Sequence, residues 1–489
     1  MCASYAAPPA RRRGAARIAA ATLGSGLVAA GVLTAAGPAA ADEAPRSPGG
    51  ASATIGGLKT YGTAVVHDDT GDHQVSAGLF EMFVDGGGML QTYCVDLHNP
   101  TQRDARYHET PWSGTSLGTN KDAGKIRWIL QHSYPQVNDL AALADKAGVK
   151  NLTEQDAAAG TQVAIWRYSD GADVDAVDPQ AEKLADYLQK NARDMAEPRA
   201  SLTLDPPAVS GRPGKRLGPV TVHTDASSVT VTPPADAATS GVRVVDAHGK
   251  PVTSAKDGSR LYFDVPKDTT TEGGDDSTGE ATGDATHAAG GPAGTAELTV
   301  QASTTVPVGR AFTSDSRSQT QILAGSSEST VSATATATWA GQGPVPALAA
   351  EKDCAKGGLD IQAVNKGDEP FIFALMGTQH SIPAHASRTV LIPLQEDQAY
   401  DFTITGPAGF AQRFAGILDC RTQSDTAGLT TQTVAEPTPA LAGNVADTTD
   451  LAETGGSDTT PLIAATGLSL LVLGATALSI VRKKKTTQG

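Results

Sequence analysis

Aromatic side chains are scarce, at 4% of the 489 residues, while Gly, Ala, Ser and Thr abound. This composition predicts several small, β-rich cores, and the length suggests about three domains. Acidic residues outnumber basic ones, giving a formal net charge of −15, which argues against a nucleic-acid partner. The ten histidines form no triad pattern with a serine elbow, so no hydrolase set is present and we do not expect an enzyme.

The first 41 residues have the composition of a secretory signal peptide. Arg11, Arg12, Arg13 and Arg17 form a basic region, an apolar stretch follows, and Ala39-Ala40-Ala41 supplies a small-residue ending. Residues 1–41 are therefore predicted to be removed, which leaves Asp42 as the mature N-terminus. The mature chain is expected outside the cell, where disulfides form.

The other end contains an apolar stretch, residues 459–481, that has no charged side chain and is long enough to cross a bilayer. Leu451-Ala452-Glu453-Thr454-Gly455 precedes it, and Arg482 with three lysines follows. This order resembles a sortase sorting signal of the LAxTG type. The resemblance implies cleavage after Thr454, attachment of Thr454 to peptidoglycan, and only transient membrane insertion of 459–481. The alternative is a single-pass membrane protein.

Removal of both ends takes away eight basic residues and one acidic residue, so the formal net charge of −15 becomes about −22. A strongly acidic mature chain is typical of a soluble surface stalk.

Of the four cysteines, Cys2 leaves with the signal peptide. Cys354 and Cys420 bracket a compact β-patterned segment, and a disulfide between them would stabilise it by about 4 kcal/mol. Cys94 is then unpaired. It is buried and inert, links two chains, or has its sulfur in another covalent bond.

Residues 154–168 are predicted to form a helix, because Thr153 and Asp156 make a near capping box and Ser169-Asp170-Gly171 supplies a stop. Gln162 shares one face of this helix with Ile165 and Trp166. Taken alone, Gln162 is most simply a buried amide that hydrogen-bonds a strand end.

The stretch Tyr93-Cys94-Val95-Asp96, followed by Thr161-Gln162-Val163-Ala164-Ile165-Trp166, resembles the YCxD and TQxAIW signatures of thioester domains in Gram-positive surface adhesins. The resemblance covers residues 52–200. It implies an internal thioester between Cys94 and Gln162 and no cofactor. Tyr93, Ile165 and Trp166 are the expected shields of the thioester against water, and Asp96 is a further candidate near it.

A thiolate is a strong nucleophile, and a glutamine amide held against it can become an activated ester. A lysine amine on a target protein or polymer would attack the Gln162 carbonyl and leave a covalent amide, once per molecule. We expect a wall-anchored adhesin on the extracellular face. The alternative is a passive structural or carbohydrate-binding surface protein with a buried free cysteine, and the target is not encoded in the motifs.

The expected fold class is multidomain, with an α+β thioester domain (52–200) followed by β-sandwich (Ig-like) domains. Residues 201–340 show short alternating runs of a sandwich spacer, interrupted by an acidic, Gly-rich stretch (268–294) without periodicity. Residues 192–364 lack asparagine, which excludes a Lys–Asn crosslink in the spacer but leaves a Lys–Asp crosslink open. A small disulfide-clamped β domain (351–420), a Thr/Ala/Pro-rich tether (421–450) and the sorting signal (451–489) complete the prediction.

The sequence gives only weak signals for a metal site. Asp68, Asp69 and Asp72 lie in a polar hairpin tip, which we interpret as a turn and not as a cation site. His380 and His385 have no third ligand nearby in sequence, so no zinc site is predicted.

Overall fold

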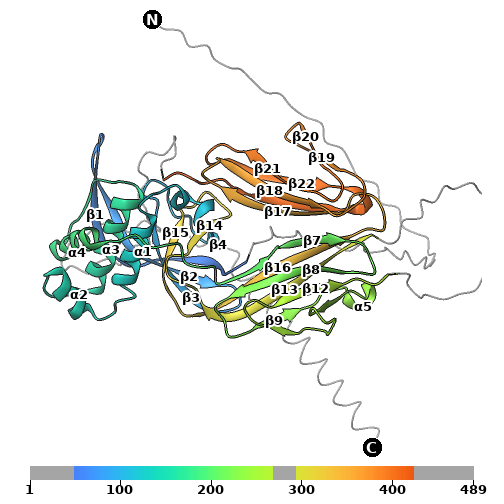
Figure 1. Ribbon diagram of the computed structural model, residues 1–489. Helices are drawn as coiled ribbons and strands as arrows, with labels where there is room; N and C mark the ends of the chain where they lie inside the picture. Colours follow the sequence, from blue (N-terminus) through green and yellow to red (C-terminus); the bar gives the residue numbers. More distant parts are fainter. Residues whose placement is uncertain (1–48, 268–292, 423–489) are drawn as a thin grey trace, which may run out of the picture. The chain divides into compact units, whose positions relative to one another are not determined.

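The computed structural model describes residues 49–267 and 293–422 (Figure 1). The predicted signal peptide, the sorting signal with its apolar stretch, nearly all of the tether and almost all of the acidic insert lie outside these ranges. Within them, no helix is both long enough and apolar enough to span a bilayer.

The first domain is built on a seven-stranded sheet with the order β2-β3-β15-β14-β4-β1-β5. Its strands are β1 (Ser52–Asp68), β2 (Gly71–Val84), β3 (Met89–Cys94), β4 (Arg106–Thr110), β5 (Val174–Ala176), β14 (Ala311–Ser314) and β15 (Gln321–Ser326). The long β1–β2 hairpin pairs from Ala53↔Val84 to Asp68↔Gly71.

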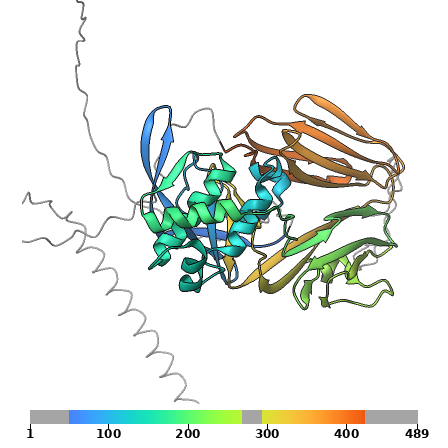
Figure 2. The ribbon, with the colours of Figure 1, turned by 60° about the vertical axis from the view of Figure 1, so that its left-hand side comes forward.

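Four α-helices cover one face of this sheet (Figure 2). They are α1 (Ala123–His132), α2 (Leu140–Ala147), α3 (Glu154–Ser169) and α4 (Pro179–Asn191), preceded by the short turns η1 (Trp112–Gly114) and η2 (Ser116–Gly118). Helix α3 starts as predicted, because Thr153 and Asp156 form a full capping box. The domain is thus a mixed α+β fold, as expected.

The predicted end of this domain at residue 200 is wrong, since β14 and β15 return to the sheet after most of the β-sandwich. The chain passes from the first domain into the sandwich, back into the first domain for β14 and β15, and again into the sandwich for β16. The two sheets of the sandwich have the orders β10-β12-β8-β6 and β11-β9-β13-β16-β7. The elements are β6 (Leu202–Asp205), β7 (Ala208–Gly211), β8 (Arg216–Thr224), β9 (Val229–Thr232), α5 (Ala237–Ser240), β10 (Arg243–Val245), β11 (Ser254–Ala255), β12 (Arg260–Asp264), β13 (Gly294–Thr305) and β16 (Glu328–Trp339).

A buried ion pair ties the two parts of the first domain together. Glu109 on β4 is fully buried and accepts hydrogen bonds from the backbone N–H of Ala51 (3.1 Å) and Ser201 (2.9 Å). Arg310, next to β14, donates to Glu109 (2.9 Å) and Glu197 (2.6 Å). A buried carboxylate needs such partners, so this network fixes where the chain leaves for the sandwich and where it returns.

The sandwich offers no buried amine for a Lys–Asp crosslink. Its four lysines, Lys215, Lys250, Lys256 and Lys267, are all exposed. Because an amine must be desolvated and held against a carboxyl group to condense with it, the crosslink left open above has no candidate lysine here.

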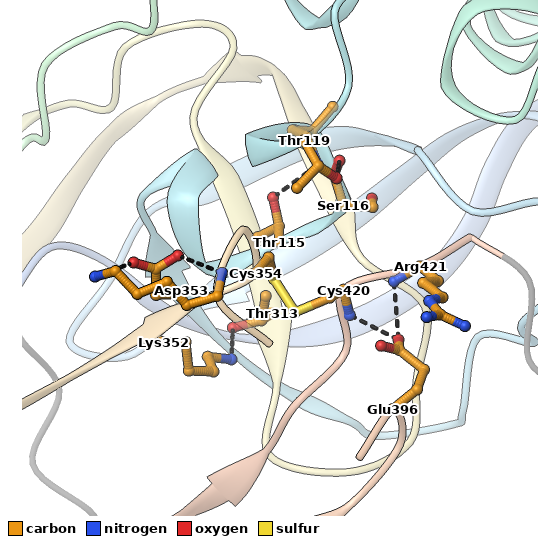
Figure 3. The surroundings of a disulfide bond; sticks show 12 residues. Thr115, Ser116, Thr119, Thr313, Lys352, Asp353, Cys354, Glu396, Cys420 and Arg421 are labelled. Carbon is orange, nitrogen blue, oxygen red and sulfur yellow. Dashed lines mark hydrogen bonds and ion pairs between the residues drawn. A yellow bond between two sulfur atoms is a disulfide. The ribbon is translucent and has the colours of Figure 1, made fainter. Parts of the chain in front are cut away.

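The C-terminal β domain starts at Pro346, slightly earlier than predicted. It contains β17 (Pro346–Asp353), β18 (Gly358–Asn365), β19 (Phe371–Leu375), β20 (Thr378–Ile382), β21 (Ser387–Pro393), β22 (Ala399–Thr405), η3 (Pro407–Gly409) and β23 (Ala411–Ile417). The Cys354–Cys420 disulfide is confirmed, with a Cα–Cα distance of 5.2 Å (Figure 3). The fold class is therefore a mixed α+β domain with β-rich domains after it.

Candidate functional site

Cys94 is the last residue of β3 and is the free cysteine of the described ranges. It is fully buried and lies opposite Gln321, the first residue of β15, in the antiparallel pairing of these strands. Directly opposite residues of an antiparallel pair place their side chains on the same face. The register alone therefore brings the Cys94 sulfur next to the Gln321 amide.

The side-chain contacts agree with that register. Nε2 of Gln321 lies 3.4 Å from Sγ of Cys94. The hydroxyl of Thr92, two residues before Cys94 on the same face, donates to Oε1 of Gln321 at 2.9 Å. The amide carbon of Gln321 thus lies between the cysteine sulfur and a hydroxyl that polarises its carbonyl.

Gln162 was predicted to bond to the Cys94 sulfur, but its side chain binds the Cys94 backbone. Its Oε1 accepts from the Cys94 backbone N–H (3.0 Å), and its Nε2 donates to the Cys94 carbonyl (2.9 Å). The pairing of β2 with β3 ends at Phe80↔Thr92, so the backbone of Cys94 has no strand on that side. The carboxamide of Gln162 makes the two hydrogen bonds that a peptide group of a neighbouring strand would make to Cys94.

Strand alternation explains why Gln162 binds the backbone and not the sulfur. Tyr93 and Val95 pack into the core beneath the helices, together with Ile165 and Trp166 of α3. Cys94 belongs to the core on the other face of the sheet. Successive side chains of a strand point to opposite faces of the sheet. A helix on the Tyr93 face therefore contacts the backbone of Cys94 on the side opposite to the Cys94 side chain. We therefore replace Gln162 by Gln321 as the amide partner of Cys94.

The predicted shielding residues also need correction. Tyr93, Ile165 and Trp166 are fully buried, but in the helix-side core, and the Tyr93 hydroxyl donates to the carbonyl of Tyr134 (2.9 Å). The core that contains Cys94 includes Tyr107, whose hydroxyl lies 2.7 Å from Oγ of Ser318. Tyr107 was missed because it lies on β4, two strands away from β15 in the sheet.

Asp96 shapes the turn that follows Cys94. It is almost fully buried and accepts from the backbone N–H groups of His98 (3.0 Å) and Asn99 (3.1 Å). Burial, the Asp170 carboxylate and Asp419 raise its pKa well above the ordinary value. Asp96 therefore holds the loop after β3, and its neighbours favour its neutral form.

Burial also raises the pKa of the Cys94 thiol above its ordinary range, while the contact with Gln321 acts in the opposite direction. The sulfur is therefore held as a neutral thiol when it is not bonded. A neutral, fully buried thiol is a poor target for external reagents.

The candidate metal ligands near the hairpin tip are occupied by local contacts. Asp68 accepts from Thr70 (2.7 Å), and Asp72 pairs with His67 (2.7 Å). His380 stacks on Phe373. In residues 49–267 and 293–422, the one grouping with metal-ligand spacing is Glu396, Asp397 and Asp419 in the C-terminal β domain.

Comparison with known proteins places the motif region in a family. The family model described as "TED: Thioester domain" matches residues 91–194, and the model described as "Bacterial phospholipase C, C-terminal domain" matches residues 346–417. No curated protein is significantly similar in sequence.

Two solved structures resemble the chain at low identity. The Bacillus anthracis TIE protein is 14% identical over 76% of this chain and 64% of its own, with a TM-score of 0.25. The thioester domain of the Enterococcus faecium TIE86 protein is 17% identical over 60% of this chain and 98% of its own, with a TM-score of 0.26. The chain thus spans less than two thirds of the Bacillus protein.

The family match includes Cys94 and Gln162 but ends before Gln321, which only the fold brings to the sulfur. With this match and the buried cysteine–glutamine pair, the chain contains a thioester domain.

Proposed function

We propose that this protein captures amine-bearing targets covalently through an internal thioester between Cys94 and Gln321. The observation that carries the proposal is the 3.4 Å contact between the Cys94 sulfur and the Gln321 amide, on paired strands of a thioester domain. Two reactants held at this separation need no diffusive encounter.

Formation of the bond requires the sulfur of Cys94 to attack Cδ of Gln321. The S–Cδ bond forms, the Cδ–Nε2 bond breaks, and the thiol proton leaves with the amide nitrogen as ammonia. Thr92 stabilises the developing charge on Oε1, because its hydroxyl already donates to that atom.

Capture of a target reverses the role of the sulfur. A lysine amine attacks Cδ of Gln321, a Cδ–N bond forms, the Cδ–S bond breaks, and a proton from the amine passes to sulfur. Burial keeps the released Cys94 thiol neutral, which slows its attack on the new amide. The reaction occurs once per molecule, so we propose an adhesin and not an enzyme.

We further propose that the protein acts on the outer surface of a cell, anchored to peptidoglycan through Thr454. The signal-peptide pattern of residues 1–41 and the LAETG motif before an apolar stretch and a basic tail support this. The confirmed disulfide is also typical of an extracellular protein.

The intact mass of the full chain tests the proposal. Beside it, the Cys94→Ala and Gln321→Met variants each remove one reacting group. We expect the unchanged chain to be lighter than calculated by one ammonia and to gain one methylamine on treatment, and both variants to do neither.

A different result favours the alternative, a passive surface protein with a buried free cysteine. In that case the mass equals the calculated value, and Cys94 titrates as a thiol after unfolding. A mass deficit that persists in Gln321→Met would return Gln162 as the partner.

A further inference from the structure

The segment after β23, residues Leu418–Thr422, leaves the C-terminal β domain and contacts the thioester domain on both sides of the Cys94–Gln321 pair. Asp419 lines a cavity together with Ser318 and lies near Thr320, the residue directly before Gln321, whose hydroxyl lowers the pKa of Asp419. The Thr422 hydroxyl lies near Asp170 and lowers the pKa of that carboxyl, and Oδ1 of Asp170 accepts from the backbone N–H of Leu97 (3.1 Å). The segment therefore bridges the start of β15 and the loop after β3.

Several bonds fasten this segment (Figure 3). Cys420 is joined to Cys354, and Oε1 of Glu396 accepts from the backbone N–H groups of Cys420 (2.7 Å) and Arg421 (2.8 Å). Cys354 itself donates from its N–H to the carbonyl of Ser113 in η1 (2.9 Å). The disulfide thus lies where the C-terminal β domain meets the thioester domain.

A second contact lies beside the disulfide. Nζ of Lys352 on β17 donates to Oγ1 of Thr313 on β14 at 3.2 Å. Further along, Nη2 of Arg317 donates to the carbonyl of Asp397 at 3.3 Å. Both Thr313 and Arg317 precede Gln321 closely, so the segment of chain that carries Gln321 is held against the C-terminal β domain.

A cavity of about 210 Å³ remains between these surfaces. On the thioester side its lining includes Asn99, Pro100 and Ser318, and on the opposite side Lys352, Asp397 and Asp419. Ser318 is in contact with Tyr107, which shares a core with Cys94. The cavity has room for a small amine or one side chain but not for the surface of a folded protein.

We infer that Leu418–Thr422 is a cover over the thioester site, locked in place by the Cys354–Cys420 disulfide. With the lock closed, the cavity admits small amines toward Gln321, which is buried beyond the cavity lining, and excludes amines on folded proteins. Reduction by a phosphine together with one water molecule breaks the S–S bond, gives two cysteine thiols and the phosphine oxide, and releases the cover. This inference rests on the proposed thioester and adds a size selection to it.

The test compares two amines on the full chain: methylamine, and cytochrome c as a folded protein with surface lysines. Rates are read by intact mass, in the oxidised chain, after treatment with a phosphine reductant, and in the Cys354→Ala/Cys420→Ala variant. A phosphine is used because a thiol would itself attack the thioester.

We expect cytochrome c to couple about tenfold faster once the disulfide is broken, and methylamine to change by less than about threefold. Because loss of the disulfide can also unfold the C-terminal β domain, Thr422→Val provides a second opening with the disulfide intact. It should raise the cytochrome c rate, while Thr378→Val, an exposed position on β20, should not.

The two proposals fail in different ways. An oxidised chain without the ammonia deficit overturns the thioester and the cover together. A chain with the deficit whose cytochrome c rate is the same in all four forms keeps the thioester and overturns the cover.

Discussion

Gln162 shows how a side chain can substitute for a strand. Its carboxamide both donates to and accepts from the backbone of Cys94, as a neighbouring peptide group would. Cys94 is at the end of β3, where the pairing with β2 has already stopped. The glutamine of the helix therefore fixes the backbone from which the reactive sulfur projects.

Replacement of Gln162 by Met should leave two buried backbone groups without partners and destabilise the fold by about 1–3 kcal/mol. Denaturant unfolding would measure this loss. The ammonia deficit should survive at low denaturant, in contrast to Gln321→Met, because the reacting amide is still present. Loss of the deficit in Gln162→Met at unchanged stability would contradict this assignment.

Thr92→Val removes the hydroxyl that donates to Oε1 of Gln321 and keeps the side-chain shape. Because a single donor to a developing oxyanion contributes about a hundredfold in rate, methylamine uptake should slow by about that factor. The rate of mass gain, with Thr63→Val on β1 as the control, checks the prediction. Equal rates for the two variants would remove Thr92 from the mechanism.

At the scale of single residues, the sequence predicted Cys94 as the cysteine of the site but not Gln321 as the neighbouring amide. The YCxD and TQxAIW motifs are adjacent in space, as expected, yet alternation along Thr92-Tyr93-Cys94-Val95 decides which atoms meet. Tyr93 and Val95 are the apolar pair that faces the helices, so Cys94 points away from them. Because this alternation is visible in the sequence, it excludes a residue of the helix that packs on Tyr93 as the acyl donor.

Among the elements, helix α3 could be predicted from local pattern, and the return of β14 and β15 could not. Helix α3 was expected over 154–168 and spans Glu154–Ser169, because its cap and its stop are local signals. The sequence of a short strand such as Gln321–Ser326 does not indicate to which sheet the strand belongs. Its alternation suits the sandwich equally well, and only long-range pairing with β3 places it.

A fragment that ends at residue 200 therefore lacks two inner strands of the sheet as well as Gln321. We expect it to show no ammonia deficit and no cooperative unfolding, because β3 and β4 would each lose the partner strand on one side. Circular dichroism melting and intact mass, beside the full chain, would check both points. A deficit in this fragment would point back to Gln162.

Across the whole molecule, buried carboxyl groups collect where the cover meets the thioester domain. Burial and the neighbouring Glu396 raise the pKa of Asp419 to about 7, against the opposing effect of Lys352. Burial raises the pKa of Asp170 to about 7, against hydrogen bonds from Ser169, Leu97 and Thr422. Both groups are better accommodated neutral in the folded chain than in the unfolded chain.

A folded pKa above the unfolded value means that the stabilisation is complete below pH 4 and is lost as the pH rises through 7. From these groups we expect a lower thermal midpoint at pH 8 than at pH 5. Asp419→Asn should reduce this difference, because an amide does not ionise. A pH dependence that is the same in the variant would show that Asp419 does not contribute.

The order of the two reacting residues along the chain has a mechanical consequence. Cys94 and Gln321 are 227 positions apart, and all strands of the sandwich except β16 lie between them. A target coupled to Cδ of Gln321 and the proposed anchor at Thr454 would place a pulling force on the chain after Gln321, so the stretch between the two reacting residues would bear no load. The loaded path passes through β16 and the C-terminal β domain, where the Cys354–Cys420 disulfide prevents the chain between its two cysteines from extending. Attachment would thus load a short, cross-linked connector.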